Sequence, residues 1–145
     1  MQAFNPPDPG FESRVRSSFN LQQLMKTISA KLVTVRPGEV HIEIPYQEAL
    51  TQQNGFIHAG IITSIVDSAC GYAAYSLMAA ASGVLTVEFK INLLSPAIGE
   101  RFIAIGRVKK PGRTLTVCEG DVFAHTQSEE KLVATMLATM MRLST

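Results

Sequence analysis

The residues best suited to chemistry lie in the stretch "TQQNGFIHAGIITSIVDSAC", residues 51–70. Asp67 is set among apolar neighbours such as Ile65 and Val66. A buried, ionised carboxylate is costly unless it is paired or hydrogen-bonded, and partial burial raises its pKa toward the range that a general base or nucleophile needs. Asp67 is therefore the candidate catalytic carboxylate, and the alternative is a structural acid held by nearby donors.

A second candidate feature precedes it, where His58, Ala59 and Gly60 are predicted to open a long helix after a turn at Gly55. The first backbone N–H groups of a helix have no intrahelical partner, and the helix dipole adds positive potential there. Such a terminus can stabilise a developing oxyanion. The alternative is an ordinary helix start with a surface histidine.

Helix geometry separates these two features within one chain. His58 and Asp67 are nine positions apart, so the two side chains point to opposite sides of the helix, about 13.5 Å apart along its axis. They cannot meet over one substrate unless each comes from a different subunit. Two such helices packed antiparallel about a twofold axis would form two composite sites. We therefore predict a homodimer at the least, with a tetramer built from two dimers left open.

The elements around this helix are predicted from periodicity and turn residues. Residues 1–29 form a proline-containing leader followed by a helical segment, with a break at 17–20 and Asn20 as the cap of a second short helix. Residues 30–46 read as a β-hairpin around Pro37-Gly38. The long helix then continues until Gly83 breaks it.

Four strands are predicted in the rest of the chain, at residues 83–96, 101–110, 113–126 and 131–143. The last could be taken for a helix, but its β-branched residues favour a strand. Strands that follow one another in sequence favour an antiparallel sheet, and a helix that is apolar almost all round must be covered on nearly every side. The expected fold is α+β, a single domain over residues 1–145 with an antiparallel sheet wrapped around one central helix.

Composition narrows the class of protein. With 46% apolar and 17% charged residues the chain is a folded protein, and its net charge of +1 favours neither nucleic acid nor a membrane as partner. Cys70 and Cys118 lack metal-ligand spacing, and we expect no metal site. The N-terminus lacks the basic start and apolar core of a signal peptide, so a cytoplasmic location is expected.

The stretch "QQNGFIHAGIITSIVDSACG" resembles the signature of the PaaI-like acyl-CoA thioesterases of the hotdog fold. That signature has an amide residue, a glycine, then His-Gly-Gly opening the central helix, with an Asp nine residues after the His. The resemblance extends through "TVEFKINLLSPA" and "GRTLTVCEGDVF". It implies hydrolysis of acyl-coenzyme A to the free acid and coenzyme A, with no cofactor other than the coenzyme A of the substrate.

Carried over by position, the resemblance gives each residue a role. Asp67 is the general base that activates water, or the nucleophile. The N–H of Ala59 receives the carbonyl oxygen, Gly60 permits its close approach, and His58 holds the loop at the thioester. Thr86 positions the water.

Gln52, with Asn54 as the alternative, orients the water or the thioester. Two positions depart from the family pattern, since Ala59 replaces a glycine and Gln52 replaces the usual asparagine.

Basic residues gather in residues 86–113, which hold six basic and two acidic side chains. Such a region in a nearly neutral protein suits a small anionic ligand, and the alternative is a solvated strand face. With the resemblance, Lys109, Lys110 and Arg113 become candidates for binding the coenzyme A phosphates. Lys90 and Ser95 are further candidates.

Two alternative functions would require other sequence features. A hotdog hydratase or dehydratase would carry its catalytic histidine in a proline-rich loop, and "FIHAGI" contains no proline. A non-catalytic acyl-CoA-binding regulator would carry a DNA-binding helix-turn-helix, and residues 1–30 hold only three basic residues, too few for that role.

Overall fold

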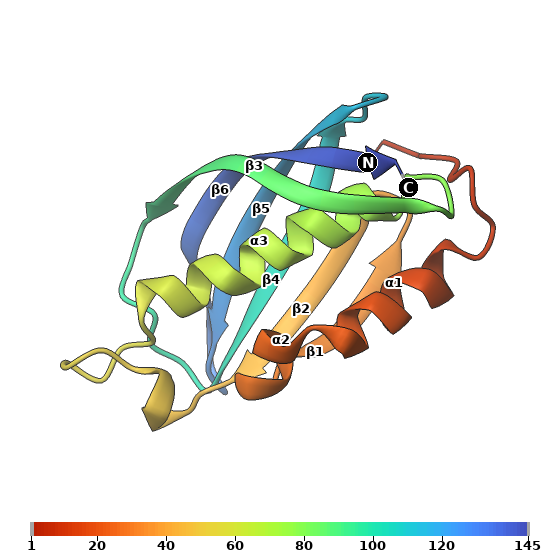
Figure 1. The fold of residues 1–145 in the computed structure, drawn as a ribbon. Coiled ribbons are helices and arrows are strands. Elements are labelled where there is room, and N and C mark those ends of the chain that lie inside the picture. Colours follow the sequence, from red (N-terminus) through yellow and green to blue (C-terminus); the bar gives the residue numbers. More distant parts are fainter. Residues whose placement is uncertain (1, 145) are drawn as a thin grey trace.

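The structure is a computed structural model that describes residues 2–144 (Figure 1). Within these residues, three α-helices, one 3-10 helix and six strands follow one another. Their bounds are α1 Phe11–Leu21, α2 Gln23–Thr27, β1 Lys31–Arg36, β2 Glu39–Pro45, η1 Glu48–Leu50, α3 Ala59–Tyr75, β3 Ser82–Leu93, β4 Arg101–Lys110, β5 Leu115–His125 and β6 Glu130–Ser144.

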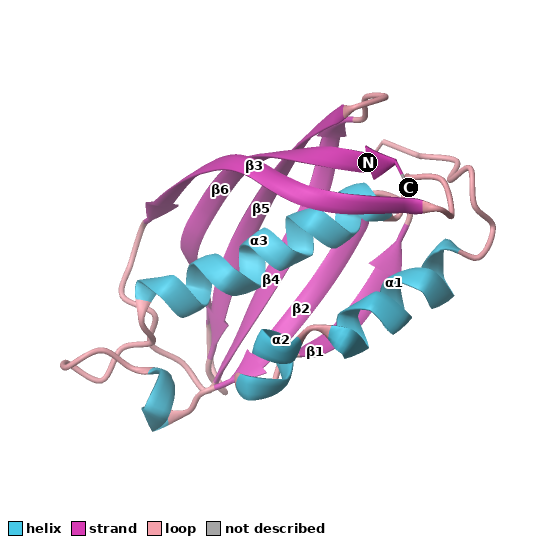
Figure 2. Ribbon diagram, in the orientation of Figure 1, coloured by secondary structure: helices cyan, strands magenta, loops and turns pink. Residues whose placement is uncertain are grey.

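All six strands form one antiparallel sheet in the order β1-β2-β4-β5-β6-β3. The sheet curves around α3, while α1 and α2 lie beside β1 at the open side (Figures 1 and 2). The predicted arrangement of a sheet wrapped around one long helix is confirmed. The last segment, β6, is a strand as expected, with buried and exposed residues alternating along its middle.

Two glycines in the sheet let it approach α3 closely. A Cβ at Gly106 would lie 2.3 Å from the carbonyl carbon of Ala69, and one at Gly120 would lie 2.5 Å from Cγ2 of Val66. These distances are shorter than real Cβ contacts, so β4 and β5 can pack against the helix backbone only where side chains are absent. This packing fixes the stretch of α3 that carries Asp67.

Two predicted boundaries are wrong. Helix α1 runs without a break through residues 17–20, because Val15 and Phe19 bury one continuous face. The break comes at Gln22, whose ψ of 107° is extended, so Gln22 and not Asn20 precedes α2. Helix α3 ends at Tyr75, and Gly83 lies inside β3.

None of the helices in residues 2–144 combines the length and the apolar content needed to cross a membrane.

Candidate active site

Asp67 lies half-buried on α3 and is held by a residue of the edge strand β3. The hydroxyl Oγ1 of Thr86 donates to Oδ1 of Asp67 at 2.7 Å. Burial raises the pKa of Asp67 above its ordinary value, and the hydrogen bond from Thr86 lowers it by a smaller amount. The second oxygen, Oδ2, has no hydrogen-bond partner among residues 2–144. The predicted combination of partial burial and a raised pKa is confirmed.

The start of α3 is capped by the side chain of His58. Its Nδ1 accepts the N–H of Gly60 at 2.8 Å, while its carbonyl oxygen accepts the N–H groups of Ile61 and Ile62. A ring nitrogen that accepts leaves the proton of the neutral imidazole on Nε2. The N–H of Ala59 has no acceptor within the described part of the chain. Ala59 is therefore the available oxyanion donor at this helix start.

The structure gives a further local reason for a glycine at position 60, beside the role that the resemblance implies. A Cβ at this position would lie 3.0 Å from Nδ1 of His58. The absence of a side chain therefore leaves room for the imidazole that caps the helix.

The loop before α3 is organised by Gln52. Its Oε1 accepts from the backbone N–H groups of Asn54 and Phe56, and its backbone N–H donates to the carbonyl of Phe56 at 2.8 Å. Gly55 has a φ of +82°, which confirms the predicted left-handed turn. With Oε1 used inside the loop, the Nε2 group of Gln52 remains as a donor.

Four of the six predicted catalytic residues lie in two separate pockets, and the other two, His58 and Gly60, line neither of them. One has a volume of about 220 Å³ and contains Asp67 and Thr86. The other has a volume of about 320 Å³ and contains Gln52, Ala59 and Ser95. The two pockets share no lining residue, and the observed helix keeps the nine-residue separation along α3. The inference that one chain cannot bring Asp67 to its own helix start therefore stands.

The residues predicted to bind the coenzyme A phosphates also lie at separate places in the sheet. Lys110 and Arg113 are exposed at the β4–β5 turn without a side-chain partner among the described residues, whereas Lys109 pairs with Glu119 at 2.6 Å. Lys90 donates to Asn92 at 3.1 Å on β3.

The backbone contacts of β6 show how far Arg113 lies from Ser95. The carbonyl of Thr114, next to Arg113, accepts the N–H of Arg142, and the N–H of Ser95 donates to the carbonyl of Val133. Arg142 lies nine positions after Val133 along β6, which corresponds to about 30 Å. One chain therefore presents Arg113 and Ser95 at opposite ends of its sheet.

Two residues that sequence reasoning missed belong to the pocket of Asp67. Ser18 and Gln22, from the helical segment placed outside the site, line it. The available signal was their four-residue spacing, which continues from Arg14 along one face of α1.

The two cysteines are core residues. Burial raises the pKa of the Cys118 thiol to about 12 and that of Cys70 well above its ordinary value. A thiol with so high a pKa is a poor nucleophile. Cys70 is therefore a buried packing residue of the core. Within residues 2–144 no cluster of three His, Cys, Asp or Glu side chains could hold a metal ion.

Comparison with known proteins identifies the family. The family model described as the thioesterase superfamily matches residues 54–131, which include the start of α3 and Asp67. The chain belongs to the thioesterase superfamily. Human acyl-coenzyme A thioesterase 13 is 31% identical over 104 residues, covering 71% of this chain and 72% of that protein.

Solved structures of the superfamily show the same fold. A thioesterase family protein from Silicibacter pomeroyi is 52% identical and superposes with a TM-score of 0.93, covering 94% of this chain and all of that one. The PaaI protein of E. coli, 16% identical, superposes with a TM-score of 0.83 over 92% of this chain and 94% of its own. The predicted family and hotdog fold are confirmed. The chain is thus a hydrolase of the esterase or thioesterase type.

Proposed function

We propose that this protein hydrolyses acyl-coenzyme A thioesters at a site shared by two subunits. The observation that carries the proposal is the pair of features on α3. Asp67, with its raised pKa, lies along the helix, and the unpartnered N–H of Ala59 lies at the helix start, eight residues earlier. A base and an oxyanion donor are what acyl transfer to water requires.

The reaction can be written with these groups. Asp67 takes a proton from water as the water oxygen attacks the thioester carbonyl carbon, and the carbonyl oxygen accepts the N–H of the partner subunit's Ala59. Collapse of the tetrahedral intermediate breaks the C–S bond, and the proton passes from Asp67 to the sulfur of coenzyme A. If Asp67 is instead the nucleophile, its carboxylate attacks the carbonyl carbon, the C–S bond breaks and coenzyme A leaves as the thiolate. Water then hydrolyses the mixed anhydride to the free acid and the Asp67 carboxylate, and the proton released in that step is taken up by the thiolate.

The edge strand β3 supports a homodimer. It is the outermost strand next to β6, and it exposes Leu85, Val87, Phe89 and Leu93. A long, apolar edge strand is an aggregation hazard unless another chain pairs with it. Pairing of β3 with its own copy about a twofold axis would bring the two α3 helices together in antiparallel orientation. The β4–β5 turn of one subunit, which carries Lys110 and Arg113, would then lie toward the start of α3 in the other subunit.

A second apolar area lies on the outer face of the sheet, over β3, β5 and β6. It is formed by Leu85, Leu115, Leu137 and Leu143, each at least 37% exposed. Contact between two dimers through this face would give the tetramer. Mass measurement in solution at micromolar concentration separates the states, and a monomeric mass would contradict the composite site.

Thiol release from a panel of acyl-coenzyme A substrates tests the reaction itself. The panel spans short, medium, long and aromatic acyl groups. The variant Asp67→Asn should lose about 10²–10⁴-fold in kcat, while Asp121→Asn, the same change on β5 outside both pockets, should keep wild-type activity. The proposal is wrong if wild type releases no thiol from any substrate, and the role of Asp67 is wrong if Asp67→Asn keeps full kcat.

The same panel separates the other two functions. A non-catalytic regulator would bind acyl-coenzyme A without releasing thiol. A hydratase would consume an enoyl-coenzyme A substrate and leave its thioester intact.

A further inference from the structure

Helix α1 runs antiparallel to α3, and polar contacts join the two helices at successive turns. As the residue number rises by four along α1, that of the partner falls by three or four along α3. The contacts are the guanidinium Nη2 of Arg14 with the carbonyl of Tyr75 at 3.2 Å, the hydroxyls of Ser18 and Tyr72 at 3.3 Å, and the hydroxyl of Ser68 with Oε1 of Gln22 at 3.2 Å. The register of α1 on α3 is therefore fixed along its length.

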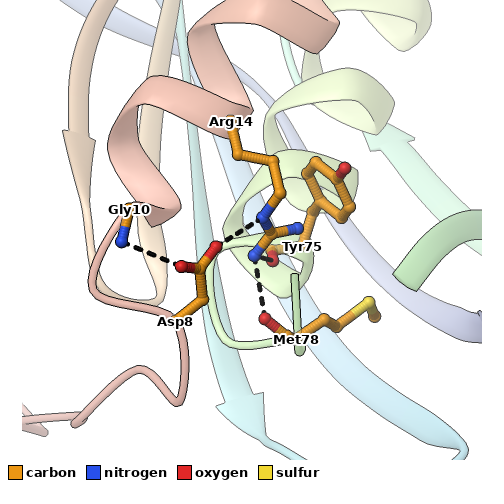
Figure 3. Close-up of polar contacts among 5 residues, drawn as sticks. All are labelled: Asp8, Gly10, Arg14, Tyr75 and Met78. Carbon is orange, nitrogen blue, oxygen red and sulfur yellow. Dashed lines mark hydrogen bonds and ion pairs between the residues drawn. The ribbon is translucent and has the colours of Figure 1, made fainter. Parts of the chain in front are cut away.

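The first of these contacts is an anchor (Figure 3). The Nε of Arg14 donates to Asp8 at 2.8 Å, and its Nη2 donates to the carbonyl of Met78 at 2.8 Å. The guanidinium carbon also lies 4.2 Å from the centre of the Tyr75 ring. The carbonyl of Tyr75 belongs to the last residue of α3 and that of Met78 lies three residues beyond it, and a cation is favoured at this end of a helix. The anchor holds the start of α1 to the end of α3.

The contacts at the other end of this series, those of Ser18 and Gln22, lie at the pocket of Asp67. This pocket has α3 on one side, with Asp67, Ser68 and Gly71, and β3 on another, with Val84 and Thr86. The remaining wall, the wall from α1, comes from Ser18 of α1 and from Gln22, the residue that directly follows α1. At about 220 Å³ the pocket is too small for the nucleotide and pantetheine arm of coenzyme A. It can receive only a small group attached to the thioester carbonyl.

The wall from α1 retains hydrogen-bond donors. Gln22 accepts from Ser68 through Oε1, and its two Nε2 protons have no acceptor in residues 2–144. The hydroxyls of Ser18 and Tyr72 share one bond, so one of their two protons remains free. An alkyl chain placed here would cover these donors without replacing the water that they bind, which is unfavourable.

We propose that this pocket binds the acyl group and that Gln22 selects acyl groups carrying a hydroxyl or carbonyl oxygen away from the thioester. This inference rests on the proposed thioesterase function and names its substrate class. A site that hydrogen-bonds a substrate oxygen discriminates against the analogue that lacks it, because the polar groups of the site are then left unpaired. Gln22 acts on specificity and leaves the chemical step to Asp67.

Matched substrates and matched variants test the proposal. The substrates are straight-chain acyl-coenzyme A esters of four to eight carbons, each with and without a terminal hydroxyl. Gln22→Met keeps the size of the side chain but removes its donors, and Gln23→Met makes the same change at an exposed neighbour that does not line the pocket. Gln22→Glu keeps a polar group that can accept the substrate hydroxyl.

The measured quantity is the ratio of kcat/KM for the hydroxylated and plain substrate at each chain length. Wild type and Gln23→Met should favour the hydroxylated substrate by about tenfold at the best length. Gln22→Met should bring the ratio close to one and Gln22→Glu should keep it above one. The proposal is overturned if wild type shows no preference at any length, or if Gln22→Met keeps the wild-type ratio. If both substrates are turned over and Gln22→Met has the same kcat/KM ratio as wild type, only this inference is overturned. If neither substrate is turned over, the thioesterase function is overturned with it.

Discussion

The hydroxyl of Thr86 donates to the carboxylate of Asp67 across 2.7 Å, from the edge strand of the sheet to the central helix. Burial and this bond act on the carboxyl in opposite directions. Burial disfavours the ionised form and raises the pKa of Asp67, while the bond from Thr86 favours the ionised form and lowers it. The net direction is upward, so burial has the larger effect.

The first prediction follows from that balance. Replacing Thr86 with valine removes the hydrogen bond and leaves the burial, so the pKa of Asp67 should rise further. Because Asp67 must be ionised to act, the acid limb of the kcat/KM profile should move to higher pH. Thr86→Ser keeps a hydroxyl and should keep the wild-type limb. A limb that moves to lower pH in Thr86→Val would contradict this account.

The second prediction concerns the oxyanion donor. Ala59 occupies the first position of α3, where proline is well tolerated. His58 has φ −57° and ψ 138°, a conformation compatible with a following proline. Ala59→Pro should therefore keep the fold while removing the N–H, and kcat should fall by about 10²–10³-fold.

Ala59→Gly provides the control, because it removes the methyl group and keeps the donor. Its kcat should stay within about tenfold of wild type. Thermal unfolding of both variants reports whether α3 is intact. Equal kcat values for Ala59→Pro and Ala59→Gly would exclude this N–H as the oxyanion donor.

The third prediction tests whether the site is shared between subunits. Asp67→Asn and Ala59→Pro should each be inactive as homodimers. After unfolding and refolding together at equal amounts, half of the dimers contain one copy of each, and each such dimer has one intact site out of two. The mixture should recover about a quarter of wild-type activity. If both residues served one site within a single chain, mixing would recover none.

The sequence could predict much of this arrangement because the information is local. The nine-residue spacing of His58 and Asp67 fixes their relative direction on any α-helix, and the pattern of apolar residues around them required a cover on nearly every side. The structure shows one continuous helix over Ala59–Tyr75, with the sheet curved around it (Figure 1). The left-handed turn at Gly55 was predictable for the same reason.

The wall from α1 could not be predicted in that way. Gln22 meets Ser68 across 46 positions of sequence, and Ser18 meets Tyr72 across 54. Such pairs depend on how two helices pack after the sheet has formed, and polar residues on an amphipathic helix are otherwise expected to face solvent. The end of α3 was missed for a related reason, because contacts from Arg14 near the N-terminus stabilise it.

The last prediction concerns acid stability and lies away from the site. Glu39 is 5% exposed and accepts hydrogen bonds from Arg107 at 2.9 Å and His41 at 2.8 Å. Burial alone raises the pKa of Glu39, but these bonds outweigh it and the pKa lies below its ordinary value. The unfolded chain therefore binds a proton at a higher pH than the folded chain does. The stability that Glu39 contributes is present above the unfolded pKa and is lost as pH falls through the folded pKa.

Denaturant unfolding from pH 7 down to pH 3 checks this sign. Glu39→Gln should lower the free energy of unfolding at pH 7 by roughly 1–3 kcal/mol, the cost of breaking a buried, charged hydrogen-bond network. The difference from wild type should shrink as the pH falls. Glu43→Gln on the same strand breaks a more exposed pair with Arg101 and should cost about 0.5 kcal/mol or less. A difference that grows toward acid pH would show that the bonds from Arg107 and His41 do not stabilise the ionised form of Glu39.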